Sequence, residues 1–419
     1  MHIENEILIN EFVWAISEAV ELISPVINNH HKKVAYISSN IAREMGLPND
    51  EMQNIVLASM LHDIGVFSIE EWIKIASFDE NHHEPERHAH IGYELLKTLE
   101  PLAKPAELIK NHHTVIGASN EETPVGSHII HLADKVSLLY DQRRDVLEQA
   151  PEMLEKIFQK RDIFQSDTLA ALERLGKLEY FWFEAFTQDI TPDMMRGVHF
   201  SRVIVDLPTL RDFAKTIAQI IDFRSRFTAT HSSGVAAVAK ELSSMSGFSD
   251  RECSMMEIAG FLHDLGKMAI PNEILEKKGA LNKMEFNLIR RHTYYTYIIL
   301  NKIRGLENIA VWAAHHHERP DGNGYPFHVK DRDFSKLSRI MAVADVVTAL
   351  TEDRPYRSGM DRKNVESILR SMTKNNGIDK DVVELANDNF CHINDTRTKA
   401  QQTAQTEYES FHESMQLPA

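Results

Sequence analysis

An internal repeat of histidine and aspartate positions is the strongest constraint on how this chain can fold. In the second half, a fixed order of such residues is spaced by 32, 29, 24 and 28 residues: His231, His263-Asp264, His292, His316-His317 and Asp345. The first half repeats that order at spacings of 32, 26, 24 and 21 residues: His30, His62-Asp63, His88, His112-His113 and Asp134. Ten of the 22 histidines therefore occupy paired positions, and the sequence predicts two copies of one module.

The residues around these positions predict helices. Apolar side chains recur at helical spacing from Ile7 to Val26 and from Leu210 to Ile221, whereas strand patterns are nearly absent. We therefore predict an all-α fold with two tandem helical domains joined by a helical connector. The expected boundaries are a first domain at 1–145, the connector at 146–206, a second domain at 207–392 and a polar tail at 393–419. For the tail, partial disorder and a loose helix both remain open.

Composition narrows the classes of function. No stretch approaches the roughly 18 unbroken apolar residues of a membrane span, and the first residues lack the basic region of a secretion signal. Only Cys253 and Cys391 occur, so no disulfide framework is expected. The net charge of −16 argues against polymeric nucleic acid as a partner but leaves a small anionic substrate open. We expect a cytoplasmic protein without a membrane partner.

The repeated residue types suit a pair of metal ions. Imidazole and carboxylate ligands together favour transition metals over calcium, and a carboxylate can bridge two ions. We expect two divalent ions in the second module, iron or manganese first, with nickel, cobalt or zinc as alternatives. Two ions roughly 3.5 to 4 Å apart activate water for attack on phosphorus, which indicates phosphoester hydrolysis. Any one of these residues could instead be a structural histidine or aspartate in the core. The repeated spacing of the whole set favours metal binding over that interpretation.

One segment of the second half resembles a known family. It reads His316-His317-Glu318-Arg319-Pro320-Asp321-Gly322-Asn323-Gly324-Tyr325-Pro326, and it follows His263-Asp264-Leu265-Gly266-Lys267. The pattern resembles the HD-GYP group of the HD phosphohydrolase superfamily over residues 207–375, and residues 25–140 resemble a generic HD domain. The resemblance implies an all-α fold and metal-dependent hydrolysis of a cyclic dinucleotide, either cyclic di-GMP or cyclic GMP-AMP, to a linear dinucleotide.

The resemblance also implies roles for individual residues. One ion would be held by His231, His263, Asp264 and Asp345, and the other by Asp264, His292, His316 and His317. A water between the two ions would attack the phosphodiester, and Lys267 would neutralise charge on the phosphate, so Asp264 and Lys267 are the expected catalytic residues. The expected substrate contacts are Lys267, Asp321, Gly322, Gly324, Tyr325, Arg354 and Arg357. Phe227 stands where some members have a glutamate for a third ion, so we expect two ions.

The first module keeps every aligned ligand type but departs from the family elsewhere. Val66 stands where the second module has Lys267. No loop like the one that contains Gly324-Tyr325-Pro326 (the GYP loop) follows His112-His113. Its candidate ligands form a second, vestigial metal site: His30, His62, Asp63, His88, His112, His113 and Asp134. We expect no catalysis there and leave three roles open, namely packing on the second module, homodimerisation and sensing of a ligand.

Two other functions compete with a cyclic-dinucleotide phosphodiesterase. One is a generic HD phosphohydrolase acting on nucleotides, and the GYP loop argues against it. The other is a non-catalytic scaffold that binds a cyclic dinucleotide. The intact lysine and the seven ligands of the second module argue against the scaffold.

Overall fold

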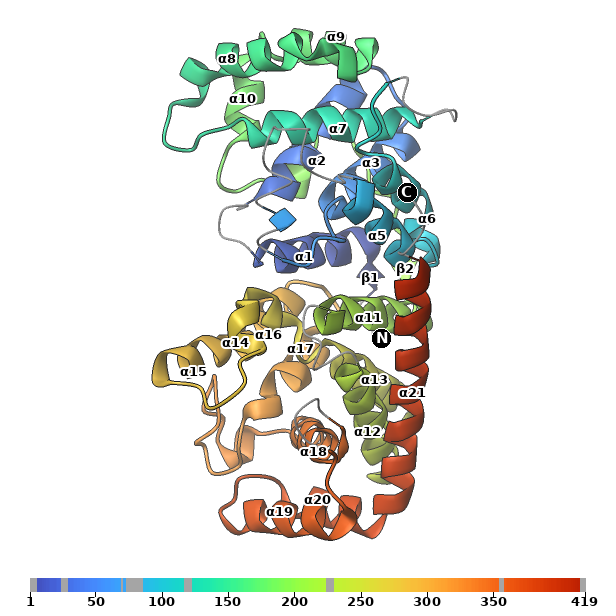
Figure 1. Cartoon of the computed structure of the whole chain (residues 1–419), viewed down its shortest axis with the longest axis vertical. Coiled ribbons are helices and arrows are strands. Elements are labelled where there is room, and N and C mark those ends of the chain that lie inside the picture. The colour runs from blue at the N-terminus through green and yellow to red at the C-terminus, as the bar shows by residue number, and fades with distance from the viewer. Residues whose placement is uncertain are drawn as a thin grey trace, which may run out of the picture. The chain divides into compact units, whose positions relative to one another are not determined.

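The computed structural model describes residues 6–23, 29–68, 71–72, 86–116, 123–223, 230–353 and 358–414. These residues are mostly helical, which confirms the predicted all-α class (Figure 1). Their only strands form one short antiparallel pair, in which Ile7 of β1 (Ile7–Leu8) lies opposite Val205 of β2 (Ile204–Val205). No helix in this part of the chain combines the length and apolar character that crossing a bilayer requires.

The chain divides into two compact units, one of residues 12–203 and one of the described residues up to 11 and from 204 onward. The boundary falls within α1 (Ile9–Glu21). Among the described residues, the other α-helices of the first unit are α2 (His30–Glu44), α3 (Asn49–Leu61), α5 (Glu86–Leu96), α6 (Ala103–Lys110), α7 (Val125–Leu138), α8 (Val146–Gln159), α9 (Ser166–Leu175) and α10 (Glu179–Ala185). Its 3₁₀ turns are η2 (Glu100–Leu102), η3 (Arg161–Ile163) and η4 (Pro192–Met194).

The second unit contains eleven α-helices among its described residues after α1. They are α11 (Leu207–Phe223), α12 (His231–Met245), α13 (Asp250–Leu262), α14 (Asn272–Leu275), α15 (Lys283–Ile289), α16 (Arg291–Leu300), α17 (Glu307–Ala314), α18 (Lys336–Thr351), α19 (Arg362–Lys374), α20 (Lys380–Asp388) and α21 (Phe390–Ser414). Its 3₁₀ turns are η5 (Leu265–Ala269), η6 (His315–His317) and η7 (Asp331–Asp333).

The internal repeat of the sequence is also a repeat of structure. Helices α2 and α12 both have 15 residues and begin at the first histidine of their module, and α3 and α13 both have 13 residues and end just before the His-Asp pair. In each module the two helices pack on each other, and the first of them carries a fully buried apolar stripe at helical spacing. The stripe is Val34, Ile37 and Ile41 in α2, and Val235, Val238 and Leu242 in α12.

A glycine after each His-Asp pair permits a close backbone contact. A Cβ atom on Gly266 would lie 1.9 Å from the carbonyl oxygen of His292, and one on Gly65 would lie 2.2 Å from the carbonyl oxygen of His88. Both distances are far below van der Waals contact, so only glycine fits. The contact holds the turn after the His-Asp pair against the next histidine of the same module.

The last helix supports the second unit. Residues 393–414, within the segment expected to be a polar tail, belong to α21, which runs alongside α12 (Figure 1). The approach is close at Gly234 of α12, where a Cβ atom would lie 2.9 Å from the side-chain nitrogen of Gln401. That nitrogen donates a hydrogen bond to Glu352, at 3.2 Å, so α21 reaches a residue at the end of α18.

Candidate metal centre and substrate pocket

The second unit brings together all seven ligands expected from the sequence. They come from five places: His231 at the start of α12, His263 and Asp264 after α13, His292 on α16, His316 and His317 in η6, and Asp345 on α18. They form two groups of donors that could each hold an ion, His231 with His263 and Asp264, and His292 with His316 and His317. Within each group the donor atoms lie within 4.8 Å of one another.

Asp264 lies between the two groups and presents one oxygen to each. Its Oδ2 is 3.2 Å from Nε2 of His263, and its Oδ1 is 3.5 Å from Nε2 of His292 and 3.9 Å from Nε2 of His316. Although burial opposes ionisation, the pKa of this carboxyl is held well below its usual range by His263 and Lys267. A buried, ionised carboxylate in this orientation can bridge two cations.

The imidazole tautomers supply a test of whether a cation fits. Nδ1 of His263, His292 and His316 donates to the carbonyl oxygens of Gly260, Ile289 and Ala313, at 2.7, 2.6 and 2.7 Å. Burial lowers the pKa of His292 to about 3 and that of His316 well below its usual value, so both rings are neutral. Their Nε2 atoms therefore carry lone pairs, yet they face each other at 3.1 Å. A metal ion bound by both nitrogens would remove this repulsion, so the residues fit the metal.

His231 is held between two carboxylates. Its Nε2 is 3.3 Å from Oδ1 of Asp345, and its Nδ1 is 3.0 Å from Oε2 of Glu352. Burial opposes a charge on this ring, but Glu352 and Asp345 together raise its pKa to about 10. A divalent cation at Nε2 would replace that proton, while Glu352 would keep the ring oriented through Nδ1. Glu352 could not be predicted from the sequence, because only the fold places it beside His231.

We expect Glu352→Ala to weaken metal binding in the second unit by about 10- to 100-fold, because His231 would lose the partner that fixes its orientation. Competition against a chromophoric chelator measures this affinity. Glu352→Gln retains an acceptor and should lose less, and Glu366→Ala, which removes an ion pair with Arg362 on α19, is the control. An unchanged affinity in Glu352→Ala would contradict the assigned role.

Lys267 lies beside the bridging carboxylate. Its Nζ donates to Oδ2 of Asp264 at 2.5 Å, and its side chain is 23% exposed, so it connects the buried cluster with solvent. Although burial alone would lower it, the pKa of Lys267 is raised by Asp264, Asp345 and Asp222. Asp222 on α11 is also buried, which raises its own pKa to about 7, and it accepts a hydrogen bond from Ser232 at 3.1 Å. Nothing in the sequence pattern pointed to Asp222.

Hydrogen bonds to Glu318 hold the GYP loop, the segment around Gly324-Tyr325-Pro326, in shape. This carboxylate is only 1% exposed and accepts backbone hydrogen bonds from Phe327, His328 and Val329, at 2.6, 3.1 and 3.0 Å. Tyr325 is thereby held next to the cluster, with its ring centroid 4.9 Å from that of His317. This role of Glu318 could not be predicted from the sequence, because its backbone partners come together only in the folded loop.

Gly322 and Gly324 in this loop must be glycine for different structural reasons. Gly322 has a φ of 74°, which L side chains rarely adopt, and a Cβ atom on Gly324 would lie 2.4 Å from the backbone nitrogen of Arg319. Asp321 accepts a 2.6 Å hydrogen bond from Arg319 and points into the loop. Of the expected substrate contacts, Tyr325 and Lys267 therefore lie beside the expected metal ligands. Asp321, Gly322 and Gly324 instead shape the loop. Arg354 and Arg357, like Phe227, lie outside the described residues.

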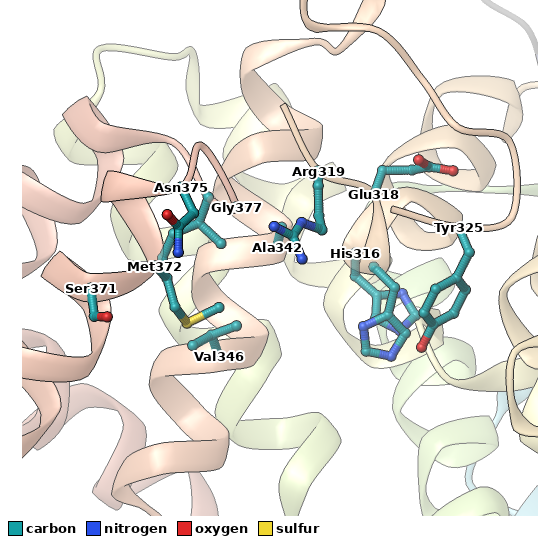
Figure 2. A pocket seen from close by; sticks show the side chains of 12 residues that line it. His316, Glu318, Arg319, Tyr325, Ala342, Val346, Ser371, Met372, Asn375 and Gly377 are labelled. Carbon is teal, nitrogen blue, oxygen red and sulfur yellow. The ribbon is translucent and has the colours of Figure 1, made fainter. Parts of the chain in front are cut away.

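A pocket of about 360 Å³ opens beside the second group of donors. Figure 2 shows His316 and Tyr325 on one side and Ser371, Met372 and Asn375 on the other, with Arg319 between them. Apolar side chains of Val346 and Met372 and the polar groups of Arg319 and Asn375 line the same space. Such a mixed lining suits a ligand with a flat apolar face and polar edges.

The first unit repeats the arrangement of the metal centre. Oδ2 of Asp63 is 2.8 Å from Nε2 of His62, and its Oδ1 is 3.2 Å from Nε2 of His88, so this carboxylate too presents one oxygen to each side. The remaining expected ligands are gathered here as well: His30 and Asp134 on the His62 side, and His112 and His113 on the His88 side. Val66, at the position of the lysine, is fully buried.

Comparison with known proteins agrees with this architecture. Relatives include a 3′3′-cGAMP-specific phosphodiesterase of Vibrio cholerae, 28% identical over 399 residues and 92% of each chain. A cyclic di-GMP phosphodiesterase of Pseudomonas aeruginosa is 40% identical over 152 residues, 36% of each chain. The fold matches a crystal structure of a cyclic GMP-AMP-specific phosphodiesterase of V. cholerae, with a TM-score of 0.63 at 20% identity, over 96% of this chain and 98% of that one.

Family models decide the classification. A model of the HD domain matches residues 27–139, and a second HD-domain model matches residues 215–382. Each match contains the seven repeated histidines and aspartates of its module. The chain therefore carries two HD domains in tandem, in agreement with the two modules that its internal repeat predicted.

Proposed function

We propose that this protein is a metal-dependent phosphodiesterase that hydrolyses a cyclic dinucleotide, cyclic GMP-AMP or cyclic di-GMP, to a linear dinucleotide in the domain of residues 207–392. The observation that carries the proposal is Asp264, which presents one oxygen to each of two donor groups beside an open pocket. The similarity of both domains to a 3′3′-cGAMP-specific phosphodiesterase makes cyclic GMP-AMP the first substrate to test.

The donor set assigns ligands to two ions. His231, His263, Asp264 and Asp345 would hold one, and Asp264, His292, His316 and His317 would hold the other. Nitrogen and carboxylate donors suit divalent iron or manganese, with nickel, cobalt or zinc as alternatives. Two such ions, when bound, supply an activated water and stabilise the charge on the phosphate oxygens.

The residues around this centre position the substrate. Lys267 carries a positive charge at the solvent-exposed edge of the cluster, where it can pair with a phosphate oxygen and offset the charge that develops there. Tyr325 covers His317 and presents its ring to the site, and a nucleobase can stack on such a face. Arg319 and Asn375 lie in the adjoining pocket, where their donors can contact base edges or the second phosphate.

Product analysis tests the proposal. Purified protein loaded with Mn²⁺ or Fe²⁺ is incubated with cyclic GMP-AMP, cyclic di-GMP and a panel of nucleoside monophosphates, and the products are separated by chromatography. We expect metal-dependent linear dinucleotide from at least one cyclic substrate. Release of nucleoside and phosphate from the monophosphates alone would instead indicate a generic HD phosphohydrolase. Binding of a cyclic dinucleotide by metal-loaded protein without turnover would indicate a scaffold.

A further inference from the structure

The first HD domain contains a histidine that the second lacks. His31 follows the first ligand, His30, and the matching position in the second domain is Ser232. Ser232 turns away to donate to Asp222, whereas Nε2 of His31 points at the His-Asp pair, 3.9 Å from Oδ2 of Asp63. His31, His62 and Asp63 form a group of donors that all lie within 4.8 Å of one another.

Two groups of donors that share His62 meet at this point, His30 with His62 and Asp134, and His31 with His62 and Asp63. Nε2 of His30 is 3.2 Å from Oδ1 of Asp134 and 3.7 Å from Oδ2 of Asp63, and Nε2 of His62 is 3.9 Å from Oδ1 of Asp134. Atoms bonded to one ion at about 2.1 Å lie at most about 4.2 Å apart. Every one of these distances is compatible with a single ion.

The inward-facing imidazole nitrogens meet the carboxylates of the same cluster. Nε2 of His30, His31 and His62 are buried and have no hydrogen-bond partner outside this cluster among the residues that the structure describes. Nδ1 of His31 lies 3.0 Å from the hydroxyl of Ser17, which fixes the ring with Nε2 directed inward. Buried polar atoms without partners are costly, and a cation among them removes the cost.

This site of the first domain is closed to solvent, whereas the candidate catalytic site of the second domain is more open. The side chains of the five donors are at most 5% exposed. In the second domain His231, His263 and Asp264 are equally buried, but Asp345 is 14% exposed and the neighbouring Lys267 is 23% exposed. Trp72, itself 3% exposed, packs edge-on against His30 with a centroid separation of 5.3 Å, and Val66 is fully buried. Structural metal sites are closed and fully ligated by protein, whereas catalytic ones keep a position for water or substrate.

We propose that the N-terminal HD domain binds a divalent transition metal at a closed, non-catalytic centre in which His31 is an additional ligand. The extra imidazole fills the coordination position that the second domain leaves to water and substrate. The ion joins α2, the turn after α3, and α7, and so holds the core of the domain together.

The rate of metal loss tests this centre in the full-length protein without an activity assay. Protein loaded with Co²⁺ is incubated with EDTA, and the metal that remains bound is measured by mass spectrometry at successive times. We expect two phases in the wild type, a fast one from the open second domain and a slow one from the closed centre. Asp264→Ala should lose the fast phase and keep the slow one. A single fast phase in the wild type, or no retained metal in Asp264→Ala, would overturn the proposal.

A matched pair of variants assigns the slow phase to His31. His31→Ala should abolish slow release and lower the unfolding temperature of the metal-loaded protein, whereas Ser232→Ala, at the equivalent position of the second domain, should keep the slow phase. Slow release that persists unchanged in folded His31→Ala would exclude this residue as a ligand. If His31→Ala does not fold, the comparison of the wild type with Asp264→Ala still decides whether a closed centre exists.

Discussion

Asp264→Ala is expected to lower turnover of the cyclic dinucleotide by at least about 10³-fold and to reduce the metal content of the second domain. The reason is the position of the carboxylate, whose two oxygens face His263 on one side and His292 on the other. Without it, each donor group would lose an anionic ligand, and the charge of two cations in a buried site would no longer be balanced. Initial rates on metal-loaded protein, together with metal analysis of the same samples, measure both effects.

Two comparisons separate this effect from a general loss of folding. Asp250→Ala removes an exposed carboxylate from the first turn of the same helix, α13, and should leave rates and metal content near those of the wild type. Asp63→Ala makes the equivalent change in the first domain and should leave the metals of the second domain in place. Wild-type turnover by Asp264→Ala would refute the assignment of this domain as catalytic.

Lys267→Met is expected to lower kcat by about 10²- to 10³-fold while both metal ions remain bound. The lysine is not among the donors of either group, but its ammonium lies at the exposed edge of the site, 2.5 Å from Oδ2 of Asp264. Its charge would act on the phosphate where negative charge develops, so the loss should appear in kcat more than in metal affinity. Steady-state kinetics and metal analysis separate the two.

The control for charge is Lys240→Met, which removes an ion pair with Glu257 on the surface of α12 and should leave kcat unchanged. Loss of bound metal in Lys267→Met would show that this lysine mainly orients Asp264. A fall in kcat with full metal content would support the role in stabilising charge on the phosphate.

Spacing predicted which histidines and aspartates come together in each domain because most of them lie at or near a helix end. His231 begins α12 and Asp264 follows α13, just as His30 begins α2 and Asp63 follows α3. A helix fixes the direction of a side chain once its first residue is known, so equal spacing predicts equal placement. The all-α class followed from the same helical periodicity.

The residues that the sequence did not reveal are those whose partners are distant in sequence. Glu352 supports His231 across 121 residues, and Asp222 is explained only by its burial near Ser232 and Lys267. His31 went unnoticed for another reason: a comparison of two copies finds the positions they share, and this donor exists in one copy only. The helical form of α21 could not be chosen over disorder because its polar sequence gains order by packing against α12.

The contact between α21 and Glu352 has a consequence for biosynthesis. Gln401 donates to Glu352, which in turn orients His231, so the support of that first ligand is completed by a residue in the middle of α21. Every donor of the first domain has been synthesised by residue 134, whereas the second domain awaits residue 401, 267 residues later. On the ribosome, where domains fold as units in order of synthesis, the proposed N-terminal metal centre would assemble before the second domain is complete.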